Sequence, residues 1–118
     1  MSRFKKVVIC GGRDFNNYEL LEEKCNEILK GFFVEVVSGC AKGADSLGVR
    51  YAEKKKVKVV EFPANWEKYG RSAGPERNKK MAKYADMVIA FWDGKSKGTK
   101  SMISLAKKSR LIVHVVRV

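Results

Sequence analysis

Runs of apolar residues along the chain alternate between lengths typical of strands and lengths typical of helices. The short runs are rich in β-branched residues, and between them apolar residues recur at helical spacing. Residues 7–10, 34–37, 57–62, 87–91 and 111–116 are the five predicted strands. This alternation predicts an α/β fold.

The first predicted helix lies between the first two strands. Its apolar stripe runs from Leu20 to Leu29, and Gly31 is expected to end it. Asn16 is placed to cap the helix, and Glu19, three residues later, completes a capping box.

Three more helices are predicted further along the chain. Helical spacing of apolar residues predicts one over residues 44–52 and another whose inner face is formed by residues 102–106. Pro75 suits the first turn of a third helix between them. Residues 64–74 have no clear periodicity, and we predict a functional loop there.

These elements predict a three-layer Rossmann-like fold, an open parallel sheet of five strands with helices on both faces. The expected strand order is 3-2-1-4-5, in which the chain reverses direction between the first and fourth strands. Folds of this kind bind ligands outside the carboxyl ends of the strands at that point. Three glycine-bearing loops, residues 11–15, 38–45 and 92–99, share this edge. Glycine lets backbone approach a ligand closely, and each following helix offers unpaired N–H groups.

The length of 118 residues predicts one domain spanning residues 1–118. No apolar run approaches the roughly 20 residues of a membrane span, and the first residues lack the apolar stretch of a signal peptide. We therefore expect a cytoplasmic protein without a membrane partner. Three cysteines without CxxC spacing and a single histidine support neither a disulfide framework nor a metal site.

The chain is strongly basic, with 25 Lys and Arg against 13 Asp and Glu and a net charge of +12. Such a charge attracts polyanions, and it is compatible with solubility alone, with a phosphate-bearing small ligand or with nucleic acid. The sequence contains no recognition-helix motif, so we expect nucleic-acid binding to be non-specific and weak at physiological salt.

Two common nucleotide-binding motifs are absent. A Walker loop needs a glycine, four residues and then Gly-Lys-Ser/Thr, but that first glycine would fall at Ile89, and Thr99 precedes Lys100. The first loop also lacks the GxGxxG spacing of dinucleotide enzymes. A Walker ATPase and an NAD-dependent dehydrogenase are both disfavoured.

Four segments together resemble a known family: "GGRDF", "SGCAKGAD", "FPANWEKYGRSAGPERNKKM" and "DMVIAFWDGKSKGT". They are similar, in this order and over nearly the whole chain, to the YspA and YpsA-related branch of the SLOG superfamily. That superfamily includes the Smf/DprA proteins and the LOG phosphoribohydrolases. The resemblance implies a Rossmann-like domain that binds nucleotides or nucleotide-derived ligands.

Carried over position by position, the resemblance implies a ligand site in the three loops and the middle segment. The loop residues are Gly11, Gly12, Arg13, Ser38, Gly39, Gly43, Asp45, Gly94, Gly98 and Thr99. The middle segment adds Trp66, Arg71, Gly74, Arg77 and Asn78.

The side chains of several of these residues are suited to contact the phosphate, ribose or base of a nucleotide. Arginines offer planar forks for phosphate or carboxylate, and an asparagine offers both donor and acceptor to a base or ribose. Trp66 or Trp92 could stack on a base, although Trp66 could equally plug the sheet edge. Asp45 could contact a ligand or only cap its helix. Asp14 in the first loop and Cys40 in the second are also predicted to contact the ligand.

The resemblance leaves open whether the protein is an enzyme. The LOG enzymes carry a glutamate three residues after the threonine of the third loop, where this sequence has Met102. We therefore favour a non-catalytic protein. Asp14, Asp45, Glu76 and Asp93 are acids that could replace the glutamate, but no two of them have diagnostic spacing.

Two further residues, Cys40 and His114, carry side chains that can act in catalysis. Cys40 is placed at a helix N-terminus, which lowers a thiol pKa, but a nucleophilic thiol would need a histidine partner. His114 falls within the fifth predicted strand, where a core or edge position is favoured.

The leading hypothesis is binding or sensing of a nucleotide or a nucleotide-derived ligand, such as ADP-ribose or an NAD derivative. One alternative is a nucleotide N-glycosidase or phosphoribohydrolase-like hydrolase. A second is a DNA-binding accessory protein of the Smf/DprA type. No cofactor is assigned, and the sequence leaves homo-oligomerisation open.

Overall fold

The computed structural model describes residues 3–118. The strands are β1 (Phe4–Gly11), β2 (Phe33–Ser38), β3 (Val59–Glu61), β4 (Met87–Trp92) and β5 (Ile112–Arg117). The helices are α1 (Tyr18–Ile28), α2 (Ala44–Lys55), α3 (Trp66–Tyr69), α4 (Ala73–Tyr84) and α5 (Lys97–Lys108), with a 3-10 turn, η1 (Gly70–Ser72), before α4.

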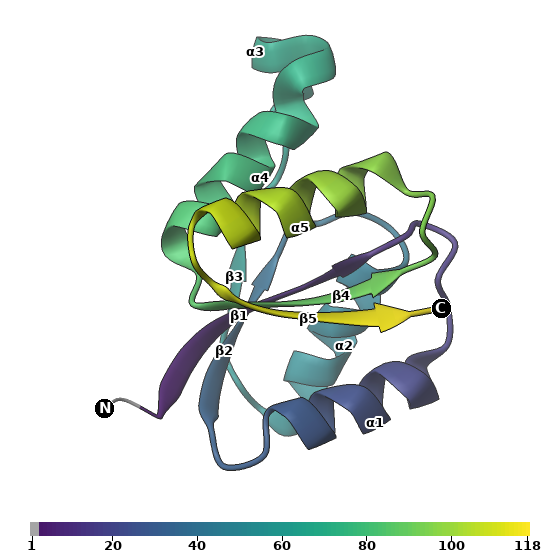
Figure 1. Ribbon diagram of the computed structural model, residues 1–118, viewed down its shortest axis with the longest axis vertical. Helices are drawn as coiled ribbons and strands as arrows, with labels where there is room; N and C mark the ends of the chain where they lie inside the picture. The colour runs from purple at the N-terminus through teal and green to yellow at the C-terminus, as the bar shows by residue number, and fades with distance from the viewer. Residues whose placement is uncertain (1–2) are drawn as a thin grey trace.

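The strands form one parallel sheet in the order β3-β2-β1-β4-β5, which confirms the predicted topology. At its centre, Val8 of β1 is paired with Val37 of β2 on one side and Val88 of β4 on the other. Helices α1 and α2 cover one face, and α4 and α5 cover the opposite face (Figure 1). The three-layer Rossmann-like fold is thereby confirmed.

The central strand is buried on both faces because its apolar run is uninterrupted. Val7 and Ile9 pack in the core cluster that contains residues of α1 and α2. Val8 and Cys10 point the other way, into the cluster formed with α4 and α5. Successive side chains of a strand alternate between faces, so this one run supports both layers.

The cap of α1 and the length of β3 differ from the prediction. The residue that caps α1 is Asn17 and not Asn16, because the Asn17 side chain accepts a hydrogen bond of 3.1 Å from the Leu20 N–H. The third strand is also shorter than residues 57–62. It lies at the edge of the sheet and pairs only with residues 36–38 of β2, so its ladder spans three residues.

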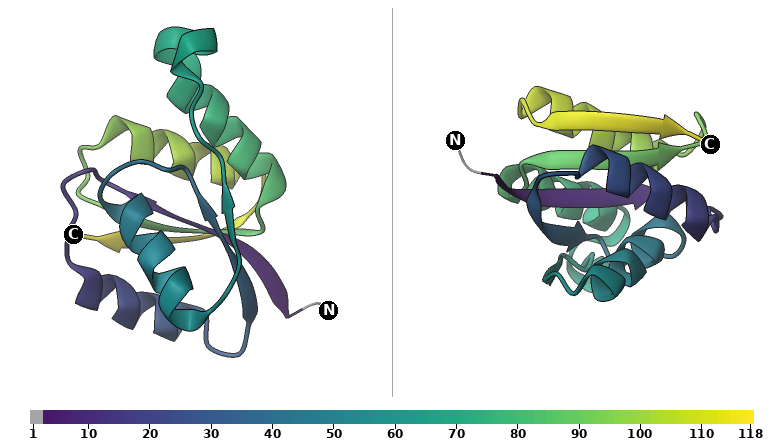
Figure 2. Two further views of the ribbon diagram at one scale, coloured as in Figure 1. Left: turned by 180° about the vertical axis from the view of Figure 1, so that it is seen from behind. Right: turned by 90° about the horizontal axis from the view of Figure 1, so that it is seen from below.

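The segment predicted as a loop over residues 64–74 is largely helical. Asn65 caps the four-residue α3 by accepting from the Lys68 N–H at 3.0 Å, and η1 leads into α4. Elements this short contain too few residues to show a period. Figure 2 shows that α3 and the start of α4 extend beyond the rest of the molecule.

The third glycine-bearing loop is shorter than predicted. Helix α5 begins at Lys97, so Gly98 and Thr99 belong to its first turn. Ser96 caps the helix, and its hydroxyl accepts from the Thr99 N–H at 3.4 Å. None of the helices in the described part of the chain combines the length and apolar character that crossing a bilayer requires.

Candidate functional site

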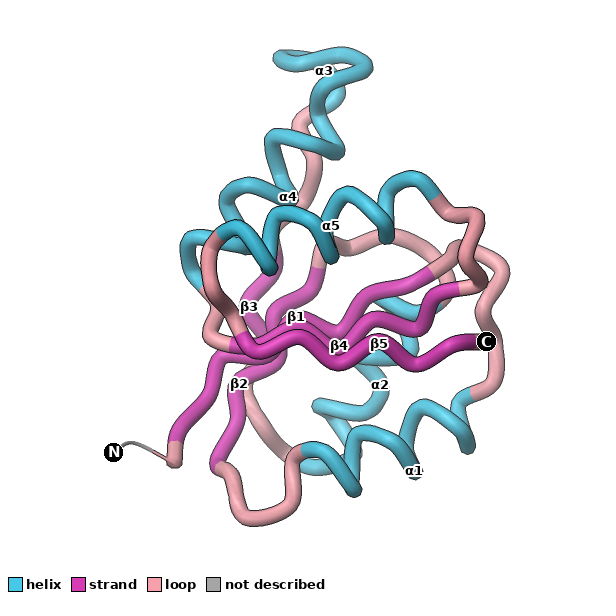
Figure 3. Tube along the Cα trace, in the orientation of Figure 1, coloured by secondary structure: helices cyan, strands magenta, loops and turns pink. Residues whose placement is uncertain are grey.

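A cavity of about 420 Å³ opens at the carboxyl edge of the sheet, between the loop after β1 and the helices α4 and α5. Its volume falls within the range of small-molecule sites. Figure 3 shows the loops that leave the carboxyl ends of β1 and β4 and lead into α1 and α5. Nine predicted site residues line the cavity: Gly11, Arg13, Asp45, Trp66, Gly74, Arg77, Asn78, Gly98 and Thr99.

Arg77 and Asn78 of α4 form hydrogen bonds that connect this helix to the second glycine-bearing loop and to α5. The Arg77 guanidinium donates one hydrogen bond to the Gly39 carbonyl and another, of 2.9 Å, to the Asn78 side-chain oxygen. Asn78 in turn donates to the Gly98 carbonyl at 3.4 Å. A guanidinium has five N–H donors, so these two bonds leave others for a ligand.

Asp45 is a buried carboxylate on the cavity wall, only 5% exposed. The residue that caps α2 is Gly43, whereas the Asp45 carboxylate accepts a 3.2 Å hydrogen bond from the Ala41 N–H in the preceding loop. Burial raises the Asp45 pKa to about 6, and the Ala41 N–H and the Arg77 charge oppose that rise only in part. At neutral pH this acid is therefore mostly ionised but close to its titration range.

The second glycine-bearing loop packs closely against its surroundings at two positions. Gly43 has a φ of +78°, and a Cβ there would collide with the carbonyl oxygens of Gly12 and Arg13. At Gly39 a Cβ would lie within 3.0 Å of the Arg77 guanidinium and the Asp45 carboxylate. Glycine at these positions lets the second loop lie against the first loop at Gly43 and against the Arg77 and Asp45 side chains at Gly39.

Two further cavities adjoin the first. Gly12 and Asp14 line a cavity of about 550 Å³, and Gly39 and Cys40 line one of about 340 Å³. Arg13 lines all three cavities, and Trp66 lines the first and the third. Trp66 is 56% exposed, so it does not plug the sheet edge.

Five predicted residues line none of these three cavities: Ser38, Gly43, Arg71, Trp92 and Gly94. Ser38 is buried, and its hydroxyl accepts from the Cys40 N–H at 3.1 Å. The Trp92 indole donates to the Ser96 carbonyl at 3.0 Å, and the Arg117 guanidinium lies over its ring. These two side chains hold loops in shape, whereas Arg71 lies exposed in η1.

The prediction of a lowered thiol pKa at Cys40 is wrong. Partial burial and the nearby Glu61 carboxylate, whose oxygen lies 3.4 Å from the sulfur, raise the Cys40 pKa. Helix α2 begins at Ala44, four residues after Cys40. His114 is half-buried on the edge strand β5, as the sequence favoured.

Several cavity residues were not predicted. They lie at the start of α5 and along α4, and include Ser96, Lys97, Ser101, Met102, Pro75 and Met81. A serine directly before an apolar-periodic segment is a capping signal, and it would have placed Ser96 at the helix start. No signal in the sequence marks the apolar wall formed by Met81 and Met102.

The chain is a Rossmann-like protein with a cavity of small-molecule size at the switch point of its sheet. The model of the YspA, cpYpsA-related SLOG family matches residues 5–69. The Gene 61 protein of Mycobacterium phage D29 is 31% identical over 119 residues, covering 92% of this chain and 94% of that protein. The chain belongs to the YspA, cpYpsA-related SLOG family.

The fold is also found in a larger solved structure. The X-ray structure of DNA processing protein A (DprA) from Streptococcus pneumoniae superposes with a TM-score of 0.76 and 18% identity. The match covers 96% of this chain and 50% of that one, so this chain spans about half the length of the DprA chain. At 18% identity, this similarity shows a shared fold and nothing more.

Proposed function

We propose that this protein binds a nucleotide or a nucleotide-derived ligand in the 420 Å³ cavity. The observation that carries the proposal is the meeting of Arg13, Arg77 and the first turn of α5 around one space. The N-terminus of a helix offers free N–H groups and a positive dipole end, and α5 has no acid in its first turn. Together with two guanidinium groups, this arrangement suits a phosphate.

The remaining walls suit the rest of a nucleotide. The Asp45 carboxylate can accept hydrogen bonds from ribose hydroxyls, and the exposed Trp66 ring offers an apolar face to a base. The ligand class we propose therefore includes nucleoside monophosphates, ADP-ribose and NAD derivatives.

The proposal is testable with a pair of arginine variants. Arg13 lines the cavity, whereas Arg71 is an exposed arginine outside the three cavities described above. Hydrogen bonds to charged groups contribute about 1.5–3 kcal/mol, so Arg13→Ala should raise the Kd roughly 10- to 100-fold.

The assay is ligand-induced thermal shift and titration calorimetry with adenosine monophosphate, ADP-ribose and NAD. Arg71→Ala serves as the control, and we expect it to bind as the unaltered protein does. Equal losses in the two variants would contradict the cavity as the binding site, and no response to the whole panel would contradict the ligand class.

We further propose that binding is non-catalytic, because Met102 lines the cavity three residues after Thr99. Its thioether can neither donate nor accept the proton that cleavage of an N-glycosidic bond requires. Incubation with nucleoside monophosphates, followed by chromatography for free base, should show no turnover.

A hydrolase is the second candidate function, and one observation favours it. Asp45 lines the same cavity, and its pKa of about 6 lies close to the range of a general acid or base. Release of free base that disappears in Asp45→Asn but persists in Asp93→Asn would establish this alternative and refute the non-catalytic proposal.

A further inference from the structure

The two helical layers carry opposite charge. Helices α4 and α5 together contain eight basic side chains and one acid, a formal charge of +7. Helices α1 and α2 contain four basic side chains and six acids, a formal charge of −2. These pairs cover opposite faces of the sheet (Figure 1), so much of the net positive charge lies on one side of the molecule.

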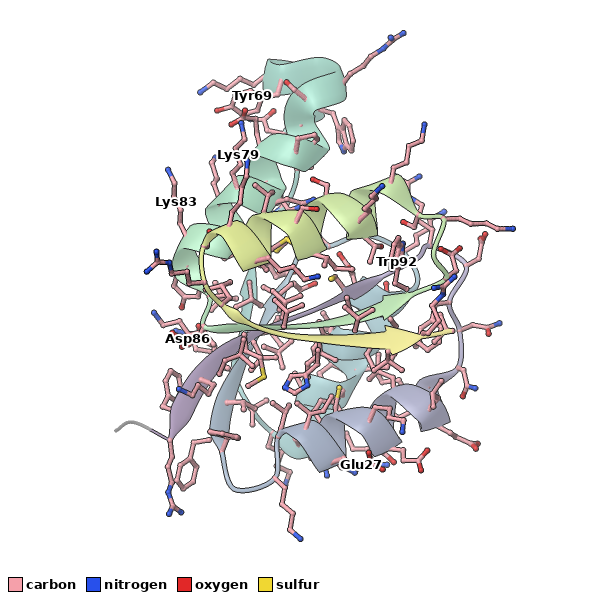
Figure 4. All side chains as sticks on the ribbon, in the orientation of Figure 1. Glu27, Tyr69, Lys79, Lys83, Asp86 and Trp92 are labelled. Carbon is pink, nitrogen blue, oxygen red and sulfur yellow. The ribbon has the colours of Figure 1, made fainter. Side chains whose placement is uncertain are left out.

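Most of the cations on the positive layer face solvent. We use the term α4–α5 surface for six exposed lysines that do not line the 420 Å³ cavity: Lys79, Lys80, Lys83, Lys100, Lys107 and Lys108. Figure 4 shows Lys79 and Lys83 extending from α4 into solvent. A helix of 12 residues is about 18 Å long, which corresponds to about five base steps of nucleic acid.

The acids of the two layers differ in how far they neutralise nearby lysines. On α1 and α2, Lys24 is paired with Glu27 at 3.6 Å and Lys54 with Glu22 at 2.6 Å. On the α4–α5 surface only Lys79 has such a partner, Glu76 at 3.3 Å, among residues 3–118.

The other lysines of the α4–α5 surface therefore retain an unneutralised positive charge. Lys80 lies over the Tyr69 ring, 5.8 Å from its centroid, and this contact leaves its charge in place. Adjacent like charges in the absence of a partner repel one another, and this repulsion is relieved when a polyanion binds.

We propose that the α4–α5 surface binds the phosphate backbone of nucleic acid without reading its sequence. The surface offers charge along two neighbouring helices, which is the arrangement that neutralises several phosphates and releases their counterions. It is separate from the nucleotide cavity, so the proposal stands or falls independently of the function proposed above.

An anionic membrane is the competing polyanion, and the distribution of apolar side chains disfavours it. Helices that lie on a bilayer insert large apolar side chains between the headgroups. The large hydrophobic residues exposed in the described chain lie in or beside the strands or, as Trp66, on α3, and none is on α4 or α5.

The test compares two triple variants with the same change in net charge. Lys83→Gln, Lys100→Gln and Lys107→Gln together remove three charges from the α4–α5 surface, while Lys24→Gln, Lys54→Gln and Lys55→Gln remove three from α1 and α2. Glutamine is a good helix former, so both variants should fold, and circular dichroism and melting temperature check this.

Binding is measured by fluorescence anisotropy with labelled 20-residue single strands and with the matching duplexes, over a series of salt concentrations. The unaltered protein should bind both at low salt, with an affinity that falls linearly on a log–log plot against salt. Each lost phosphate contact reduces that slope by about 0.7 to 0.9, so the α4–α5 variant should lose about two to three from its slope. The α1–α2 variant should keep the slope of the unaltered protein.

Three outcomes would overturn the proposal. Equal losses in the two variants would show that net charge alone, and not this surface, governs association. Absence of binding at low salt would remove nucleic acid as the partner. Binding to vesicles of anionic phospholipid in the absence of nucleic-acid binding would identify a membrane as the partner.

Discussion

Replacement of Asp45 by asparagine should stabilise the protein at neutral pH and not at acidic pH. The carboxylate is almost fully buried, and its pKa in the folded protein is raised from 3.8 to about 6. A group whose pKa is raised by folding contributes stability that is fully present below its unfolded pKa. That contribution is lost as the pH rises through the folded pKa.

The size of the effect follows from the two pKa values. Their separation corresponds to a difference of about 3 kcal/mol in the free energy of unfolding between the fully protonated and the fully ionised carboxyl group. Between about pH 4.5 and about pH 7.5 the unaltered protein should lose about 2 kcal/mol of unfolding free energy through this one group. Asparagine does not titrate, and its side-chain oxygen can still accept from the Ala41 N–H, so the variant avoids this loss.

The assay is urea denaturation of both proteins over this pH range, with the difference in unfolding free energy plotted against pH. All other titrating groups largely cancel in that difference. We expect the advantage of Asp45→Asn to grow by about 2 kcal/mol from the acidic to the neutral end. A flat difference would refute the burial of an ionised carboxylate in the cavity wall.

Asp93 provides a control of opposite sign. Its carboxylate accepts from the backbone N–H groups of Ser96 and Lys95, each at 2.8 Å, and these bonds lower its pKa. Its contribution to stability is present above the unfolded pKa and is lost as the pH falls through the folded pKa. Asp93→Asn should therefore be the less stable protein at neutral pH, and its deficit should shrink on acidification.

Two other predictions concern the second glycine-bearing loop. Gly43→Ala should lower the unfolding free energy by at least about 1–3 kcal/mol, since alanine meets both an unfavourable φ and the carbonyl oxygens of the neighbouring loop; unchanged urea denaturation would contradict this. The Cys40 thiol should react with iodoacetamide more slowly than free cysteine at neutral pH, and Glu61→Gln should accelerate it by removing the carboxylate that raises the thiol pKa. Equal alkylation rates in the variant and the unaltered protein would exclude that role of Glu61.

The strand order of the sheet could be predicted from the sequence because it follows from features of short segments. The apolar run of β1 must be buried on both faces, and right-handed crossovers then leave few arrangements of five parallel strands. The predicted end of a helix was less accurate where a single side-chain hydrogen bond decides which residue caps it. Asn16 and Asn17 are adjacent and equally suited to capping, and only the hydrogen bond to the Leu20 N–H distinguishes them.

The cavity was predicted only in part, for a related reason. The glycines and arginines of the predicted site segments favoured a ligand site, and Gly11, Arg13 and, on α4, Arg77 line the cavity. The burial of Asp45 depends on how α4 packs over the second loop, which no local pattern encodes. Trp92 lines none of the three cavities, and its indole donates a hydrogen bond to the Ser96 carbonyl of its own loop.

The proposed binding site also makes a prediction about Gly98. This glycine lines the cavity in the first turn of α5, and a Cβ placed on it would meet no atom within 4 Å. Valine has a higher helix propensity than glycine, so Gly98→Val should fold normally while its side chain takes up space beside α5 that the ligand needs.

Ligand-induced thermal shift of Gly98→Val, together with its far-UV circular dichroism, tests nucleotide binding in this cavity most directly. A ligand at a hundredfold excess over its Kd stabilises a protein by about 2.7 kcal/mol. The unaltered protein should show such a shift with at least one of adenosine monophosphate, ADP-ribose and NAD. Gly98→Val should retain the circular dichroism spectrum and lose the shift. A variant that keeps both its spectrum and its full thermal shift would contradict the placement of the ligand in this cavity.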